Sequence, residues 1–384
     1  MQKNFHSARL LIAVGARTLI RSDVKDSELL PFDGELLKTR RATYEVIKLL
    51  GRGGFGAVYE IRQKDKPELH FAAKFEMSDV KKQVLSMDCR VLRGAVQIRS
   101  PHFCPIVDRG KVSGRFRFMV MKLVGQNLWD LRKEQPESRF SLSTSLKIAE
   151  QCLMAIEDLH RIGYLHRDVK PGNFAIGQHD QNEQQIVHLL DFGLCRKFMN
   201  DDKKQDLRRP RESAPFRGTT RYASLAAHRQ QEQARKDDIE AWLYMIVEWT
   251  AGSLPWRKLK SGDKNDVLRF KESIREESSR EFFVHCPYVE FRGILLYVDS
   301  LFYQSIPDYN YVYYCLQHAK KVYKINPREP LDWDPENKYF GPTKADRDRR
   351  IDLHVDEETL ADTTPSRTDK HKSEDGKSGK KSSI

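Results

Sequence analysis

The pattern of apolar residues changes near Val124-Gly125, and this change restricts the fold more than any other feature of the chain. Before it, short runs rich in β-branched and aromatic residues alternate with glycine and polar segments, which is typical of strands joined by turns. We expect strands at about 44–50, 57–61, 70–75, 104–108 and 115–121, with one helix at about 80–92. The first part of the chain therefore predicts a small, mostly β module of five strands.

After Val124-Gly125 the apolar residues recur at helical spacing. Leucine, alanine and isoleucine residues from Leu146 to Leu159 would share one face of a helix. The serine- and threonine-rich stretch 141–145 precedes this helix and could cap it. Residues 238–249 form a second strongly apolar helical pattern. The sequence thus predicts an α+β fold with two lobes, the first rich in strands and the second mainly helical.

These patterns also suggest domain borders. We place one domain at 43–320, with the β-rich lobe at 43–123 and the helical lobe at 124–320. A loosely ordered extension is expected at 321–342. Residues 343–384 lack aromatic side chains, and residues 373–383 are mostly lysine, serine and glycine, so we expect a disordered polar tail. Residues 1–42 are expected to be a flexible basic extension. Its first 22 residues contain no acid, which leaves a mitochondrial presequence as the alternative.

The net charge restricts the kinds of partner that the protein can attract, and the cysteine content restricts its cellular compartment. The net charge is +12, so the surface attracts nucleic acid, acidic membranes or acidic and phosphorylated proteins. The six cysteines show no metal-ligand spacing and are typical of reduced thiols in an intracellular protein. No apolar run approaches the roughly 20 residues that span a bilayer. We expect a cytoplasmic protein, with the nucleus as a second compartment.

A glycine-rich run lies between the first two predicted strands. The run Gly51-Arg52-Gly53-Gly54-Phe55-Gly56-Ala57-Val58 fits the pattern G-x-G-x-x-G-x-V. Glycines allow the backbone to approach phosphate oxygens and to direct N–H groups at them. A simple glycine hairpin would also explain this run. A dinucleotide-binding loop is disfavoured, because that loop opens a helix and here a strand follows.

Lys74 lies in the short apolar strand that follows the glycine run. A lysine there is unfavourable unless an anion neutralises it, and the alternative is an edge-strand lysine that reaches water. Its carboxylate partner is expected on the next helix. Asp88 is the best candidate, because Leu85 and Leu92 stand three and four residues away on the same face. Glu76 is too close to Lys74 along the strand.

The run His166-Arg167-Asp168-Val169-Lys170-Pro171-Gly172-Asn173 carries the most specific chemistry. Asp168 can accept or orient a substrate hydroxyl proton, and Lys170 can neutralise charge on a transferred phosphoryl group. Asn173 offers an amide oxygen to a hard cation such as Mg²⁺. Asp191, in Asp191-Phe192-Gly193, offers a carboxylate to the same metal. Together with the glycine run and Lys74, these residues predict transfer of a phosphoryl group from ATP.

In these residues the chain resembles eukaryotic protein kinases, from about Thr43 to Ala319. The Lys170 position resembles serine/threonine rather than tyrosine kinases. No Ala-Pro-Glu follows Gly193; the segment Arg221-Tyr222-Ala223-Ser224 resembles the casein kinase 1 group instead. Arg161 to Asp168 and Leu254-Pro255-Trp256-Arg257-Lys258 are most similar to tau-tubulin kinases.

The resemblance implies further roles. Thr219 would bridge the catalytic aspartate and lysine, and Asp238 would anchor the catalytic loop. Asp88 is one methylene shorter than the glutamate usual at its position, so its pair with Lys74 would be longer or need the helix drawn inward. ATP would contact Leu50, Gly51, Gly53, Gly54, Phe55, Gly56, Val58, Ala72, Lys74, Met121 and Leu123. Arg221, with Arg217, Lys258 and Lys260, would bind acidic or phosphorylated substrate residues; the alternative is ordinary solvated charges.

Three functions remain open from the sequence. The first is an active serine/threonine kinase that uses ATP and Mg²⁺ on acidic or phosphorylated proteins, with cytoskeletal proteins among the candidates. The second is a weakly active kinase or pseudokinase scaffold that binds ATP and acidic partners, suggested by Asp88 and the charged tails. The third is polyanion binding, although no basic motif interleaved with aromatic residues predicts specific nucleic-acid recognition. We expect a monomer.

Overall fold

The computed structural model describes residues 30–53, 56–78, 80, 83–200, 207–260, 262–276 and 278–341. The presequence-like pattern, the roles given to Gly54 and Phe55, and the polar tail 343–384 lie outside the described residues. Among the described residues, no helix is long and apolar enough to cross a membrane.

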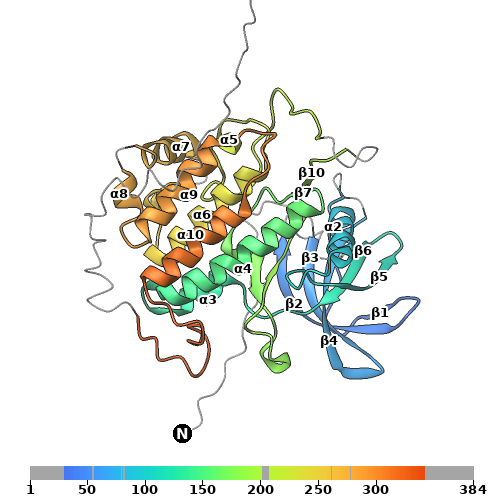
Figure 1. Ribbon diagram of the computed structural model, residues 1–384. Coiled ribbons are helices and arrows are strands. Elements are labelled where there is room, and N and C mark those ends of the chain that lie inside the picture. The colour runs from blue at the N-terminus through green and yellow to red at the C-terminus, as the bar shows by residue number, and fades with distance from the viewer. Residues whose placement is uncertain are drawn as a thin grey trace, which may run out of the picture. The chain divides into compact units, whose positions relative to one another are not determined.

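The β-rich lobe is built on one antiparallel sheet whose strands lie in the order β1-β2-β3-β4-β6-β5 (Figure 1). Its strands are β1 (Leu36–Lys38), β2 (Thr43–Gly53), β3 (Gly56–Gln63), β4 (Lys66–Met77), β5 (Ile106–Val112) and β6 (Phe116–Lys122). One helix, α2 (Leu85–Gln97), packs against β4, β5 and β6. The expected module of strands with one helix is confirmed.

The sheet has one strand more than the five expected, because β1 pairs with the start of β2. Leu36 lies opposite Glu45 in this pair, and Leu37 is buried in the core of the lobe. Three residues are too short to show strand periodicity in a sequence. The Arg115 guanidinium also holds this segment, because it donates hydrogen bonds to the Glu35 carboxylate and to the Leu30 carbonyl. The described lobe therefore begins before residue 43.

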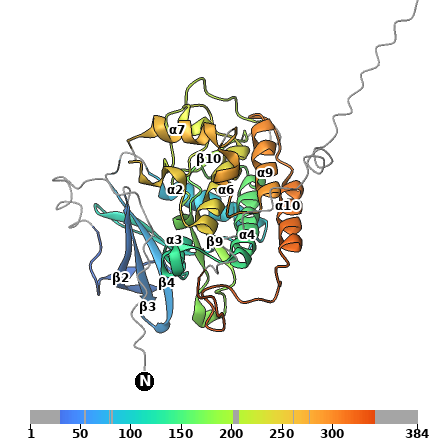
Figure 2. The same ribbon diagram turned by 90° about the vertical axis from the view of Figure 1, so that its left-hand side faces the viewer.

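The second lobe is mainly helical, as expected (Figures 1 and 2). Its helices are α3 (Leu128–Glu134), α4 (Leu142–Arg161), α5 (Leu225–His228), α6 (Arg235–Ala251), α7 (Lys264–Ser273), α8 (Ser279–Phe282), α9 (Tyr288–Ser300) and α10 (Tyr309–Val322). Two small antiparallel pairs lie between α4 and α5. They join β7 (Tyr164–Leu165) to β10 (Arg196–Lys197), and β8 (Phe174–Ile176) to β9 (Val187–Leu189).

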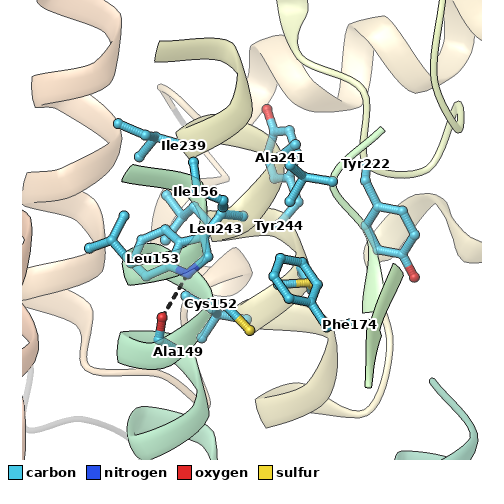
Figure 3. Close-up of a cluster of buried hydrophobic side chains, with 14 of the residues drawn as sticks. Ala149, Cys152, Leu153, Ile156, Phe174, Tyr222, Ile239, Ala241, Leu243 and Tyr244 are labelled. Atoms are coloured by element: carbon cyan, nitrogen blue, oxygen red, sulfur yellow. Dashed lines mark hydrogen bonds between the residues drawn. The ribbon is translucent and has the colours of Figure 1, made fainter. Parts of the chain in front are cut away.

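The core of this lobe forms where α4 meets α6 (Figure 3). Leu153 and Ile156 of α4 are fully buried, which accounts for the apolar periodicity of the sequence. The Trp242 indole of α6 donates a hydrogen bond to the Ala149 carbonyl at 2.9 Å, so its one polar group is satisfied inside the core. The Ser141 hydroxyl accepts the Thr144 N–H, and the predicted cap of α4 is confirmed.

Helix α2 shares its apolar face with the core of the helical lobe. Leu85, Val91 and Leu92 belong to the same buried cluster as Leu159 and Phe192. Packing of α2 is therefore linked to both lobes, and it fixes where Asp88 lies.

The segment after α10 is more firmly packed than the loosely ordered extension expected at 321–342. Asp332 is buried and accepts hydrogen bonds from the Ser141 hydroxyl (2.7 Å) and the Thr144 hydroxyl (2.8 Å), at the start of α4. Leu331 is buried beside it. These partners lie far away in the sequence, so a local pattern could not indicate them. The described helical lobe extends past residue 320.

Candidate active site

Lys74 reaches two carboxylates from the middle of β4. Its ammonium lies 3.0 Å from Asp88 on α2 and 2.9 Å from Asp191. Asp88 also accepts the Phe192 N–H at 3.0 Å, so one buried carboxylate joins the strand, the helix and the segment after β9. The shorter side chain at position 88 thus makes direct contact with Lys74. The predicted Lys74–Asp88 pair is confirmed.

Charge balance at this cluster favours an ionised Asp191. Burial alone would lower the pKa of Lys74, but the carboxylates of Asp191 and Asp88 hold that pKa above its ordinary value. Burial would raise the pKa of Asp191, yet the Lys74 ammonium lowers it to about 2. Burial and the neighbouring Asp191 raise the pKa of Asp88. Lys74 and Asp191 therefore carry the stronger charge interaction, and Asp88 orients Lys74 as a hydrogen-bond acceptor.

Glu76 has a role that sequence reasoning missed. Its buried carboxylate accepts the backbone N–H groups of Val84 and Leu85 at the start of α2, and it pairs with Arg117 of β6. A carboxylate at a helix N-terminus satisfies free N–H groups and interacts favourably with the helix dipole. Glu76 therefore fixes the start of the helix that carries Asp88. The sequence did contain a signal for this role. The helix after the strand has Val84 where a capping side chain is usual, and Glu76 is an acid in the preceding strand.

Three polar side chains hold Asp168 in place. The Thr219 hydroxyl donates to Asp168 Oδ1 at 2.7 Å, and the Lys170 ammonium donates to Oδ2 at 2.8 Å. Lys170 also lies 3.3 Å from the Thr219 hydroxyl, so the bridge expected of Thr219 is present. Asn173 donates to the Asp168 carbonyl at 2.8 Å. A carboxylate held in this way can receive and orient a substrate hydroxyl.

Thr219 reaches Asp168 because a glycine precedes it. Gly218 has φ +105°, and a Cβ at this position would lie 2.6 Å from the Arg167 carbonyl oxygen. Only glycine permits both that backbone conformation and that close approach.

Asp238 of α6 anchors the catalytic loop through hydrogen bonds to its backbone. Its carboxylate accepts the backbone N–H groups of His166 (2.7 Å) and Arg167 (2.8 Å) and the ring nitrogen of His160 (2.9 Å). Although burial opposes it, hydrogen bonding from His160 lowers the pKa of Asp238 below its ordinary value. The anchoring role predicted for this residue is confirmed by these bonds.

Two oxygen donors fit a divalent cation. The Asn173 side-chain oxygen is buried and has no hydrogen-bond partner among the described residues, while its amide nitrogen is engaged by Asp168. A buried polar atom without a partner is unfavourable unless something else satisfies it. The Asp191 side chain is about one-third exposed and carries negative charge. An amide oxygen and a carboxylate are ligands that a hard cation such as Mg²⁺ prefers.

The predicted nucleotide contacts lie in one pocket between β2, β3 and β6. Glycine, apolar and charged residues share its wall: Gly51, Gly53, Gly56, Val58, Ala72, Lys74, Met121, Leu123 and Asp191. Leu50 packs with Val58 and Ala72 in an apolar cluster that Met121 and Leu123 complete. Such a cluster suits a flat aromatic base.

The glycine run forms the tip of the β2–β3 hairpin rather than the start of a helix. Gly53 lies opposite Gly56 in this pair, so the dinucleotide-binding alternative is excluded. A Cβ on Gly56 would lie 1.8 Å from the Phe75 carbonyl oxygen, which makes glycine necessary there.

The four residues expected to bind substrate anions differ in whether they have a partner within the protein and in how exposed they are. Arg221 lies 3.1 Å from the buried carboxylate of Glu248 and stacks over the Trp129 ring, so an internal partner already neutralises it. The Trp256 indole donates to the Arg221 carbonyl, which places the 255–258 turn beside Arg221. The other three assigned residues are exposed: Arg217, Lys258 and Lys260.

The family model for the protein kinase domain matches residues 44–287. A Dictyostelium discoideum protein named as a probable serine/threonine-protein kinase is 35% identical over 304 residues, which cover 78% of this chain. The chain spans 58% of that relative's length.

Two Caenorhabditis elegans relatives match over more of their own length. The serine/threonine-protein kinase spe-6 is 36% identical over 319 residues, covering 81% of this chain and 81% of the relative. A protein with casein kinase I in its name is 30% identical over 326 residues, covering 83% of this chain and 90% of the relative.

Proposed function

The chain belongs to the protein kinase family, and on that premise we propose that it is a serine/threonine kinase of the casein kinase 1 group, similar to tau-tubulin kinases. It would use ATP and Mg²⁺ and modify hydroxyl groups of proteins. Support for the group comes from the relative named casein kinase I and from Arg221-Tyr222-Ala223-Ser224 without a following Ala-Pro-Glu.

One observation carries the proposal: every charged group needed for phosphoryl transfer is present and paired. Lys74 is held by Asp88 and Asp191, and Lys170 is held by Asp168. ATP supplies the γ-phosphoryl group when bound. Asp168 receives or orients the substrate hydroxyl, while Lys170 lies beside it to neutralise charge on the transferred group.

Asn173 and Asp191 would hold the Mg²⁺. The unpartnered oxygen of Asn173 and the ionised carboxylate of Asp191 are the supporting observations. A cation held by these fixed oxygen ligands would neutralise negative charge on the phosphate groups, and its ligands would not have to rearrange during the reaction.

The proposed substrates are proteins with acidic or phosphorylated residues near the acceptor hydroxyl, cytoskeletal proteins included. Arg217 precedes Gly218 and Thr219 in the segment beside the catalytic loop, and it is exposed. Lys258 follows in the turn that contacts Arg221. Because Arg221 is already paired with Glu248, we assign the substrate anion mainly to Arg217, Lys258 and Lys260.

Synthetic peptides test this assignment. The full chain should phosphorylate a serine peptide with neighbouring glutamates or phosphoserine at a kcat/KM about tenfold above that of its neutral counterpart. Arg217→Glu should raise the KM for the acidic peptide and leave kcat for the neutral peptide close to that of the wild type. Equal kcat/KM for acidic and neutral peptides would remove the substrate preference but not the kinase activity.

The pseudokinase alternative loses its main support, since Asp88 contacts Lys74 directly at 3.0 Å. Turnover of ATP by the wild type, absent in Lys74→Met, would reject that alternative. Because all six cysteines are free thiols, we also propose a reducing compartment, cytoplasm or nucleus. We propose a monomeric protein as well.

A further inference from the structure

A groove rich in cationic side chains lies on the β-rich lobe beside α2, outside the pocket that contains Lys74. We call it the basic groove and define it by six exposed residues: Lys38, Arg40, Arg41, Arg90, Arg93 and Arg109. Its walls are α2, β5 and the connection from β1 to β2. Thr39 and Arg41 of this connection donate hydrogen bonds to Asp108 and to the Val107 carbonyl of β5. None of these six residues contributes to the active site described above.

The charge of the basic groove is not balanced by acids. Asp108 is the one acid among the described residues that line it. Its carboxylate already accepts hydrogen bonds from the Thr39 hydroxyl (2.6 Å) and the Tyr44 hydroxyl (3.2 Å). Arg90 and Arg93 form no ion pair within the part of the chain that the structure describes. Exposed like charges in close proximity repel one another, so a bound anion would lower their energy.

The floor of the basic groove is apolar. Ile106 and Val107 line it from β5 and are partly exposed, while Leu85 and Leu92 of α2 are buried beneath. Val96, near the end of α2, is 59% exposed at its rim. A ligand that fits must therefore carry negative charge for the walls and aliphatic side chains for the floor.

We propose that the basic groove binds an acidic segment of a partner protein, in which aspartate or glutamate alternates with aliphatic residues. Such a peptide matches both the cationic walls and the apolar floor. Single-stranded nucleic acid is a poorer match, because it needs exposed aromatic rings for stacking. The aromatic residue that lines the groove, Phe118, is buried.

Binding at this groove is coupled to the active site through α2. Arg90 and Arg93 extend from the helix on which Asp88 contacts Lys74. A peptide that bridges α2 and β5 favours the position of α2 seen in the structure. By linkage, it can raise activity only to the extent that it prefers this position over others.

Direct binding measurements test the proposal. The probe is a fluorescein-labelled 12-residue peptide of alternating glutamate and leucine, which contains no serine or threonine and cannot be a substrate. Its affinity for the full-length wild-type chain would be compared with that for Arg90→Glu/Arg93→Glu/Arg109→Glu. We expect Kd to rise at least about tenfold in this variant, since each exposed ion pair changes affinity a few-fold.

The matched control is Lys64→Glu/Lys66→Glu/Lys321→Glu, which changes the net charge equally at exposed sites outside the groove. It should leave Kd within about twofold of the wild type. Hydrogen exchange should slow in residues 85–97 and 106–112 when the peptide is added. Circular dichroism and thermal unfolding establish that both variants are folded.

Three results would overturn the proposal. One is the absence of peptide binding by the wild type at low ionic strength. Another is an equal loss of affinity in the groove variant and the control variant, which would mean that only net charge matters. A third is tighter binding of a single-stranded DNA of equal charge that is lost in the groove variant, which would make the groove a nucleic-acid surface. None of these measurements depends on kinase turnover.

Discussion

The Asp88 side chain is one methylene shorter than a glutamate, and its contacts show whether it reaches Lys74. The carboxylate is buried, lies 3.0 Å from Lys74 and accepts the Phe192 N–H at the same distance. An added methylene would have to fit into a packed space, and overpacking of that kind is destabilising. The short acid is thus matched to its site rather than a defect in it.

This reasoning predicts the effect of two substitutions. Asp88→Glu should not raise kcat/KM and is expected to lower it by about two- to tenfold, because the longer side chain displaces α2 or Lys74. Asp88→Ala should lower kcat/KM by about ten- to a hundredfold, because Lys74 loses an oriented acceptor. Steady-state kinetics with varied ATP checks both. A markedly faster Asp88→Glu enzyme would show that the wild-type pair is too long.

Single residues also show how far the sequence could be interpreted. Lys74, Asp168 and Asp191 were predictable because their chemistry depends on short motifs with fixed spacing. Asp88 followed from helical periodicity. Glu76 did not, since its partners are backbone groups of a helix that folds back over the strand. Nor could the pairing of Arg221 with Glu248 be predicted, because it joins segments that are not adjacent in sequence.

Among the secondary-structure elements, α2 connects most features of the molecule. Glu76 fixes its start, Asp88 points to the active site, and Arg90 faces the basic groove. Its apolar face is buried with residues of the helical lobe. The helix was predictable from periodicity, but its first turn was placed too early. The carboxylate that fixes its start comes from another element.

Glu76→Gln tests the importance of this start. The glutamine oxygen can still accept both N–H groups of α2, because they bond to one oxygen of Glu76. The negative charge at the start of α2 and the ion pair with Arg117 are lost, so the free energy of unfolding should fall by about 1–3 kcal/mol. Urea denaturation measures this change, and kcat/KM should fall with it. The control is Glu45→Gln, which breaks a part-exposed ion pair with Arg62 on the same sheet and should cost under about 1 kcal/mol. Equal effects of the two substitutions would contradict the role given to Glu76.

For the whole molecule, we expect the free energy of unfolding to depend on pH through Asp237, the buried acid next to Asp238. Asp237 lies beside Asp238 in the first turn of α6. One oxygen of its carboxylate accepts the Ala234 N–H at 2.6 Å, and the other has no hydrogen-bond partner among the described residues. Burial raises its pKa to about 7. The folded state therefore keeps a proton that the unfolded chain loses near pH 4.

The sign of this dependence follows from proton linkage. Between about pH 4 and pH 7 the folded chain binds more protons at Asp237 than the unfolded chain does. The contribution to the free energy of unfolding thus falls as pH rises through this range and is constant above it. Asp237→Asn keeps an acceptor for Ala234 but removes the titration. Thermal unfolding from pH 5 to pH 8 should show a more negative slope for the wild type than for Asp237→Asn. Parallel curves would contradict the assigned pKa.

The two-lobed architecture was the most predictable property of the whole molecule, because strand and helix periodicities occupy separate parts of the chain. Its borders were less predictable. Strand β1 has only three residues, too few to show strand periodicity. The segment around Asp332 is stabilised by Thr144, 188 residues away in the sequence. Long-range pairing of this kind leaves no local pattern.

The central claim is that this chain transfers phosphate through Asp168. The most direct measurement is the rate of phosphate transfer from ATP to an acidic protein by the full chain and by Asp168→Asn. We expect turnover by the wild type and a loss of about 10²- to 10⁴-fold in the variant, with its nucleotide affinity retained. Turnover that survives in Asp168→Asn, or no turnover by the folded wild type with ATP and Mg²⁺, would contradict the account.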